Sequence, residues 1–165
     1  MRSELATLTA VDGKALALRR WLPDGPPRAV IQVVHGMAEH SGRYERFATA
    51  AAVAGFAVVA DDHRGHGATI AAPDERGHTD DADGWSLVLD DLGTVRADVE
   101  AAWARALRRR VLTLLDSLPE GTAVTPTWVR AALTFARPRR AVPEGAVTAV
   151  QSEAAPLGLT GCGAE

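Results

Sequence analysis

The sequence predicts an α/β fold built around a parallel sheet. Two short and almost continuously apolar runs, residues 29–34 and 56–60, flank a stretch of helical spacing. Such β-branched runs are typical of strands that are covered on both faces. A strand, a helix and a second strand joined by short links form a right-handed βαβ unit. A hairpin signal precedes this unit and a long amphipathic pattern follows it.

The N-terminal hairpin is predicted from a turn signal between two alternating stretches. Residues 5–11 alternate loosely between apolar and polar side chains and end at Asp12-Gly13, a dipeptide that favours a tight hairpin turn. Residues 14–21 resume the alternation as a second strand. The segment 23–27 then holds three prolines and one glycine, which predicts a loop.

The βαβ unit has recognisable ends. Its first strand, 29–34, is expected to be central in the sheet and runs into a polar loop. A helix is expected over 43–54, and Gly55 suits the position just after its end. The second strand, 56–60, leads into a histidine-rich loop over 61–67.

A long helix is predicted to begin at Gly84, after an exposed acidic connection over 68–83, and to have the arginines at 105–110 at its end. Apolar residues recur at helical spacing and form one face, which we expect to pack in the core. The members of this face are Trp85, Val88, Leu89, Leu92, Val95, Val99, Trp103 and Leu107.

Beyond the long helix the pattern becomes weaker. Residues 111–115 are consistent with a third buried strand, and residues 127–135 with a short helix. Residues 136–165 are rich in Ala, Pro, Gly and Arg without a clear period, so we expect most of them to be irregular and poorly ordered.

Composition places the chain among ordinary globular proteins. Of its 165 residues 47% are hydrophobic and 24% are charged, and the net charge of −3 is too small to imply a nucleic-acid partner. Cys162 is the only cysteine, so no intrachain disulfide is possible, and its thiol is expected to be incidental. No apolar leader and no run of 18 apolar residues occurs, so we expect a cytoplasmic protein without a transmembrane segment. The sequence does not fix an oligomeric state.

Charge and histidine are unevenly distributed along the chain. Residues 1–103 hold 10 Lys+Arg and 16 Asp+Glu, whereas residues 104–165 hold 8 and 5. All five histidines precede residue 79. This asymmetry predicts two parts of different origin, a domain over 1–103 and a divergent tail over 104–165.

Two motifs at predicted strand ends carry a family resemblance. Residues 33–44 read VVHGMAEHSGRY, which closely resembles the His-Gly-x-x-Glu-His-Ser-x-Arg-Tyr signature of monoacylglycerol lipases and bacterial lysophospholipases. Residues 60–67 read ADDHRGHG and resemble the Asp-x-Arg-Gly-His-Gly turn of the same family. The helix over 84–103 resembles the helix that precedes the family's nucleophile strand. The chain is thus similar, over roughly residues 5–103, to the N-terminal half of serine aminopeptidase S33-type α/β-hydrolases.

The resemblance implies an incomplete α/β-hydrolase fold and a serine ester hydrolase of lipid monoesters, either monoacylglycerols or lysophospholipids. Acyl transfer develops negative charge on the carbonyl oxygen, which backbone N–H groups beyond a strand end stabilise. By position, Met37 resembles the first such donor, through its backbone, and Gly36 permits close approach of the substrate. The side chains of His35, Glu39 and His40 resemble loop-shaping residues of the family. The family implies no cofactor and no metal.

The nucleophile motif of the family is not found. In place of Gly-x-Ser-x-Gly the chain reads LLDSLPEG over 114–121, where Ser117 has neither flanking glycine and Pro119 would disturb the following helix. Ser117 is therefore only a weak candidate nucleophile. Ser86, at the start of the long helix, fails the same test. No histidine follows His78, so the late base of the triad is also missing, and a serine without a base is a poor nucleophile.

The second motif has two interpretations, a metal site and ordinary hydrogen bonding. His63 and His66 lie beside Asp61 and Asp62, but no third well-placed ligand is evident, so hydrogen-bonded turn histidines are the favoured interpretation. The arginines at 105–110 are similarly interpreted as a solvated helix end.

Several origins remain open for the tail: out-of-frame translation, a fusion or deletion, or a pseudoenzyme that binds rather than cleaves. The first function hypothesis is a truncated lipid ester hydrolase with little activity of its own. The second is a non-catalytic protein whose tail, with a short helix over 127–135 and a basic cluster over 137–140, binds a protein or nucleic acid.

Overall fold

A computed structural model describes residues 1–119, 121–136, 142–143 and 145–154. The chain divides into two compact units, unit 1 over Met1–Glu100 and unit 2 over Ala101–Glu165, and each is described by itself. The described strands are β1 Arg2–Thr9, β2 Ala15–Leu22, β3 Val30–Val33 and β4 Ala57–Asp61. The described α-helices are α1 Glu45–Val53, α2 Gly84–Asp116, α3 Pro126–Ala136 and α4 Ala146–Ala154, with short 3-10 turns at Ser41–Tyr44, Gly67–Thr69 and Pro73–Glu75.

The sheet of unit 1 has the strand order β1-β2-β4-β3. β1 and β2 form the predicted antiparallel hairpin, and Gly13 at its turn adopts a φ of +89°, which a side chain would disfavour. β3 and β4 pair in parallel, with Val30 opposite Ala57, and α1 joins them. The predicted hairpin and βαβ unit are therefore confirmed.

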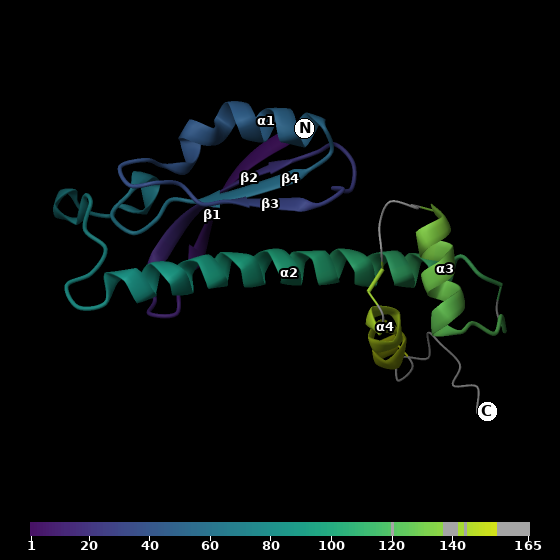
Figure 1. Cartoon of the computed structure of the whole chain (residues 1–165). Helices are drawn as coiled ribbons and strands as arrows, with labels where there is room; N and C mark the ends of the chain where they lie inside the picture. The colour runs from purple at the N-terminus through teal and green to yellow at the C-terminus, as the bar shows by residue number, and fades with distance from the viewer. Residues whose placement is uncertain (120, 137–141, 144, 155–165) are drawn as a thin grey trace. The chain divides into compact units, whose positions relative to one another are not determined.

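Helices cover both faces of this sheet. α1 lies on one face and the first part of α2 on the other (Figure 1). Beneath α1, the core contains the fully buried Trp21 and Val58 packed with Ala48 and Ala52 of the helix. On the opposite face, Leu18 and Val59 pack against Val95 of α2, with Ala6, Leu8 and Val99 at the margin.

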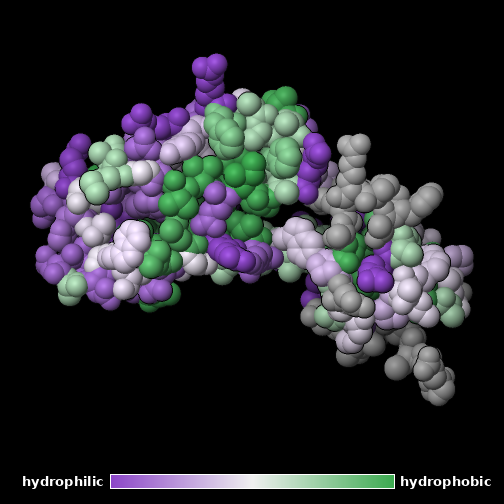
Figure 2. Space-filling model, viewed as in Figure 1, coloured by the Kyte–Doolittle hydropathy of each residue, from purple (hydrophilic) through white to green (hydrophobic). Residues whose placement is uncertain are grey.

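β3 does not occupy the central position that its apolar sequence predicts. β4, in which every residue is buried, lies between two strands, whereas β3 pairs only with β4 among the described residues. Val30 and Val34 are 37% and 51% exposed as a result. Figure 2 shows the corresponding hydrophobic surface between α1 and α2, where β3 runs. A continuous apolar run identifies a strand but not its place in the sheet order.

Unit 2 is a small helical cluster. Leu107 and Val111 from the last turns of α2 share one core with residues of α3, of α4 and of the segment before α4, namely Val129, Leu133, Val142, Val147 and Val150. The predicted strand over 111–115 is wrong, because α2 continues as a helix to Asp116. Leu107 and Val111 stand four residues apart on one helical face, and this spacing buries them together.

The sequence predicted α3 but not α4. The short helix expected over 127–135 is confirmed as α3, which starts at Pro126, a residue favoured in the first helical position. The Thr125 hydroxyl accepts the backbone N–H of Trp128 at 3.2 Å and caps this helix. α4 forms where the sequence showed no clear period. The basic cluster at 137–140 and Cys162 lie outside the described residues, and the separate origin of residues 104–165 stays a prediction.

None of the described helices combines the length and the apolar character that crossing a membrane requires.

Candidate active site

Two loops meet where the parallel strands β3 and β4 end, because the carboxyl ends of parallel strands lie at the same edge of a sheet. The backbone N–H of His63 donates to Nε2 of His35 at 2.9 Å, and the two imidazole rings stack with centroids 3.8 Å apart. The backbone N–H of Ser41 donates to the Asp62 carboxylate at 2.6 Å. The two sequence motifs therefore form one hydrogen-bonded unit.

Hydrogen bonds fix the protonation of His35. Its Nε2 accepts a hydrogen bond, so its proton is on Nδ1, which donates to the Gly36 carbonyl at 2.9 Å. Burial of the ring, which is 4% exposed, lowers the pKa of His35 because the charged form loses hydration. His35 is consequently a neutral ring that shapes the loop.

His63 has the opposite character. Its Nδ1 faces the Asp61 carboxylate at 2.7 Å and its Nε2 faces the His35 carbonyl at 3.2 Å, so both ring nitrogens meet acceptors. Burial alone lowers the pKa of His63, but the hydrogen bond and the negative charge of Asp61 outweigh it and raise this pKa. The ring whose pKa is raised thus stacks on the ring whose pKa is lowered, under the first loop.

Glu39 holds the first loop in shape. One oxygen of its carboxylate, Oε2, accepts the backbone N–H of Gly36 at 3.2 Å and the hydroxyl of Tyr44 at 2.8 Å. The Tyr44 hydroxyl, followed by the Gly36 amide, lowers the pKa of Glu39, because both bonds favour the ionised form. Arg43 approaches the other oxygen at 3.3 Å. His40 is exposed and stands just before the 3-10 turn.

Met37 presents an unoccupied backbone donor. Among the described residues, its N–H makes no hydrogen bond. Its side chain is 93% exposed, and the next residue, Ala38, adopts a φ of +60°, a left-handed conformation that non-glycine residues rarely hold. This geometry leaves one N–H available to an anionic or carbonyl oxygen.

Arg64 fastens the second loop to the rest of unit 1. Its guanidinium donates to Asp91 of α2 at 2.6 and 2.9 Å and to Asp12 of the hairpin turn at 2.6 and 2.8 Å. These bonds raise the pKa of Arg64 and lower that of Asp12 well below its usual range, because each ion stabilises the other. Arg64 belongs to the second motif and Asp91 to the predicted long helix, but sequence spacing gave no sign that they meet.

An open hollow of about 1010 Å³ lies between the first loop and the start of α2. Its polar side is formed by the two histidine loops and Arg76. Its apolar lining consists of Val34, Met37, Ile70, Trp85, Val88 and Leu92. The helical spacing of Trp85 predicts a core residue, and this prediction is wrong, because the side chain is 74% exposed at the rim. Trp103 is 37% exposed and likewise not a core residue.

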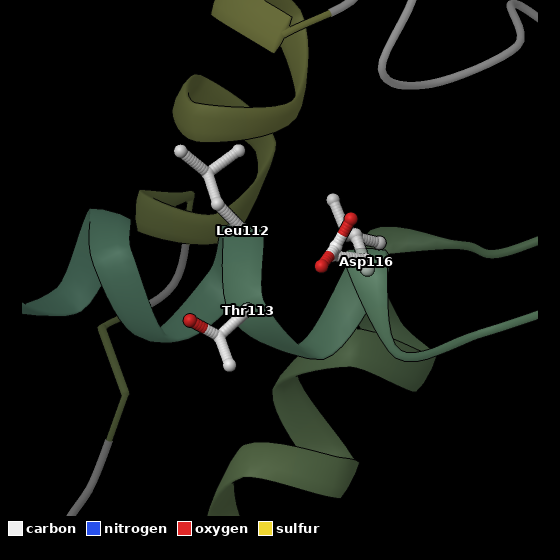
Figure 3. A pocket seen from close by; sticks show the side chains of 4 residues that line it. Leu112, Thr113 and Asp116 are labelled. Carbon is white, nitrogen blue, oxygen red and sulfur yellow. The ribbon is translucent and has the colours of Figure 1, made fainter.

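The serine candidates lie elsewhere. Ser117 follows the last residue of α2 in unit 2, and its hydroxyl donates back to the Leu114 carbonyl at 2.6 Å, a common arrangement at a helix end. A pocket of about 330 Å³ next to it is lined by Leu112, Thr113, Leu115 and Asp116 (Figure 3). This pocket contains no histidine, since all five belong to unit 1. Ser86 is exposed in the first turn of α2.

The histidines of the second loop use their ring nitrogens in hydrogen bonds. His63 bonds to Asp61 and His35, while Nδ1 of His66 donates to the Arg64 carbonyl at 2.8 Å. Within the described part of the chain, no group of three His, Cys, Asp or Glu side chains is arranged to hold a metal ion.

Comparisons with known proteins identify the family to which the chain is similar. The family model described as "Serine aminopeptidase, S33" matches residues 25–114. Monoglyceride lipase of Homo sapiens is 47% identical over 64 residues, which cover 39% of this chain and 21% of that protein. Monoacylglycerol lipase of Mycolicibacterium smegmatis is 44% identical over 61 residues, covering 37% and 22%.

A solved structure gives the same indication. The thermostable carboxyl esterase from Bacillus coagulans, crystallised with glycerol, superposes with a TM-score of 0.55 at 34% identity. That match covers 62% of this chain and 33% of the esterase. The chain spans between about a fifth and a third of the length of these three proteins.

Proposed function

We propose, from the premise that the chain belongs to the serine aminopeptidase S33 family of α/β-hydrolases, that unit 1 binds the carbonyl group and acyl chain of a lipid ester. The substrate class is a carboxylic ester with a single acyl chain, a monoacylglycerol or a lysophospholipid. The observation that carries the proposal is the unoccupied N–H of Met37 at the edge of an apolar hollow.

The first loop suits stabilisation of a carbonyl oxygen that becomes negative. A fixed N–H placed where charge develops is most effective when no rearrangement is needed during the reaction. The Met37 amide meets this condition, because Glu39 holds the loop from one side and the neutral ring of His35 supports it from below. In this fold type the second donor is the residue after the nucleophile. The chain has no such residue in its family position.

The lining of the hollow suits an acyl chain. Apolar side chains of Ile70, Trp85 and Leu92 form a wall beside the motif loop, and the Met37 side chain projects from the loop itself. Burying an acyl chain against this wall contributes roughly 0.8 kcal/mol for each methylene removed from water. The polar loops opposite leave room for a hydrated head group.

We propose further that the chain is a truncated hydrolase that lacks its nucleophile. Ser117 has no flanking glycines, and its hydroxyl is bonded to a helix carbonyl. No histidine follows residue 78, so the base that would activate a serine is absent from its family position. This exact chain is therefore expected to hydrolyse esters slowly or not at all. A cytoplasmic location stays a prediction.

Hydrolysis of p-nitrophenyl butyrate by the full chain tests the proposal that the chain lacks its nucleophile. The expected rate is close to the uncatalysed background, and Ser117→Ala is expected to leave it unchanged. Ser86→Ala is the matched control, because Ser86 is equally exposed at the other end of the same helix. Appreciable turnover that is lost only in Ser117→Ala would show that Ser117 is a nucleophile and that the truncation proposal is wrong.

Translation of the coding DNA across codons 95–165 in all three frames tests the origin of the tail. A Gly-x-Ser-x-Gly motif in another frame, with later acid and histidine codons, would support an out-of-frame tail. The absence of such a motif would favour the second candidate function, a non-catalytic binding protein. One observation supports that alternative: Val111, Val129 and Val147 pack in a shared core that an accidental sequence would rarely form.

A further inference from the structure

The second motif loop contacts the first through His66, a residue to which the proposed ester binding assigns no role. We propose that His66 is a positioning residue that holds the Met37 amide in its binding orientation. This inference rests on the proposed role of Met37. It assigns a function to the histidine of the Arg-Gly-His-Gly turn, which lies on the other loop.

The tautomer of His66 makes it an acceptor. Its Nδ1 donates to the Arg64 carbonyl at 2.8 Å, so the neutral ring carries its proton there and leaves a lone pair on Nε2. That nitrogen faces the backbone N–H of Ala38 at 3.4 Å. The ring also lies beside His35, with centroids 5.3 Å apart. His66 is thereby held by its own loop while it contacts the other one.

Three successive amides of the first loop show what this contact does. The N–H of Gly36 donates to Glu39 and the N–H of Ala38 donates to His66, while the N–H of Met37 between them has no partner among the described residues. Two side-chain acceptors therefore hold the loop on either side of the proposed oxyanion donor. With both neighbours occupied, the Met37 N–H is the one left to bind a ligand.

The backbone of Ala38 needs this support. A φ of +60° brings its Cβ close to the carbonyl oxygen, so an alanine in this conformation relaxes unless surrounding bonds hold it. The bond to His66 is the restraint on the Ala38 amide itself. Without that bond, Ala38 can return to a negative φ. This change rotates the peptide between Met37 and Ala38 and alters the loop around the Met37 N–H.

Two glycines shape the loop that carries His66. Gly65 and Gly67 on either side both adopt positive φ, at +71° and +50°. A side chain at Gly67 would collide with the Asp62 carboxylate, which accepts the N–H of Ala68 at 2.7 Å. The glycines thus let the chain turn closely around Asp62 and present the His66 ring to the first loop.

Nuclear magnetic resonance of the 15N-labelled full chain tests the hydrogen bond without any ligand. We expect imidazole nitrogen shifts that identify a proton on Nδ1 of His66, and an Ala38 amide resonance that moves in His66→Ala. His66→Gln is the conservative variant, because its side-chain carbonyl can accept the same N–H. His78→Ala is the matched control, since His78 pairs with Asp81 in the exposed connection. A proton on Nε2, or an Ala38 resonance indifferent to His66→Ala, would overturn the inference.

Titration with hexanoate then measures the effect on binding, since its carboxylate imitates the developing oxyanion and its chain the acyl group. The Met37 amide resonance is expected to shift in the unaltered chain. We expect binding on the order of fivefold weaker in His66→Ala, as for loss of one hydrogen bond, with recovery in His66→Gln and no change in His78→Ala. Equal affinity in all four proteins would refute the positioning role. A confirmed His66 bond without any hexanoate shift at Met37 would instead contradict the proposed function.

Discussion

Replacing Arg64 by leucine should destabilise unit 1 more than any other single change to its charged residues. The guanidinium is 5% exposed and bonds to two carboxylates. Asp91 is 1% exposed, so removal of Arg64 leaves a buried charge without a counterion, whereas Asp12, at 38%, regains water. An uncompensated buried charge costs about 3–5 kcal/mol. That is a large share of the roughly 5–15 kcal/mol that stabilises a typical domain.

Urea unfolding followed by circular dichroism measures this loss. With slopes of about 1–3 kcal/mol per molar urea for small domains, the midpoint should fall by on the order of 2 M. Arg20→Leu is the control, because Arg20 pairs with Asp98 and Glu4 while 26% exposed, and such pairs contribute at most about 1 kcal/mol. The double variant Arg64→Leu, Asp91→Leu should recover most of the loss, since neither charge remains buried alone. Equal midpoints for Arg64→Leu and Arg20→Leu would refute this reasoning.

Two further predictions concern pH and the apolar wall. The lowered pKa of His35 stabilises unit 1 above pH 6.5 and is lost on acidification, while the raised pKa of His63 stabilises it below pH 6.5 and is lost as pH rises. Urea midpoints between pH 5.5 and 8 should therefore peak near 6.5, and a monotonic trend would contradict the assigned protonation states. Trp85→Ala should weaken the affinity for a non-hydrolysable monoacylglycerol ether, measured by calorimetry, on the order of tenfold, whereas Trp103→Ala should not. Equal losses of affinity in the two variants would argue against an apolar wall that contains Trp85.

Local sequence patterns predicted the hairpin and the βαβ unit. The Asp12-Gly13 turn and the apolar periods that flank Gly55 specify a hairpin and a βαβ unit, because turn geometry and strand alternation are encoded within a few residues. The run at 111–115 was misassigned, since a short apolar stretch suits a buried strand and a buried helical turn equally well. Its packing against α3 and α4, which lie later in the chain, decides the matter.

The candidate site was predictable in its residues but not in its connections. The motif named His35, Met37 and Glu39 and placed them at a strand end, where the structure also has them. The unoccupied amide of Met37 and the bond between His66 and Ala38 follow from three-dimensional proximity of two loops 28 residues apart. Side-chain spacing along the sequence contains no signal for such contacts.

Trp85 shows a related limit of periodicity. Its spacing places it on the apolar face of α2, but the residues of that face that pack against the strands, Val95 and Val99, lie later in the helix. Val95 packs against the strands, whereas Trp85 in the first turn of the helix lines the hollow. A helical pattern gives the direction of a side chain but not whether a neighbour is present there.

The position of β3 at the edge of its sheet makes the behaviour of this chain depend on concentration. Among the described residues, one row of its backbone N–H and C=O groups has no partner strand, and apolar side chains surround it. Such an edge can accept a strand from another molecule. By mass action, a strand that binds only the folded chain raises the apparent stability of that chain. A higher protein concentration has the same effect, because it favours binding of a second copy. The melting temperature of this chain should therefore be measured over a series of protein concentrations. Its dependence on concentration separates the stability of the single chain from the stability added by association with another molecule.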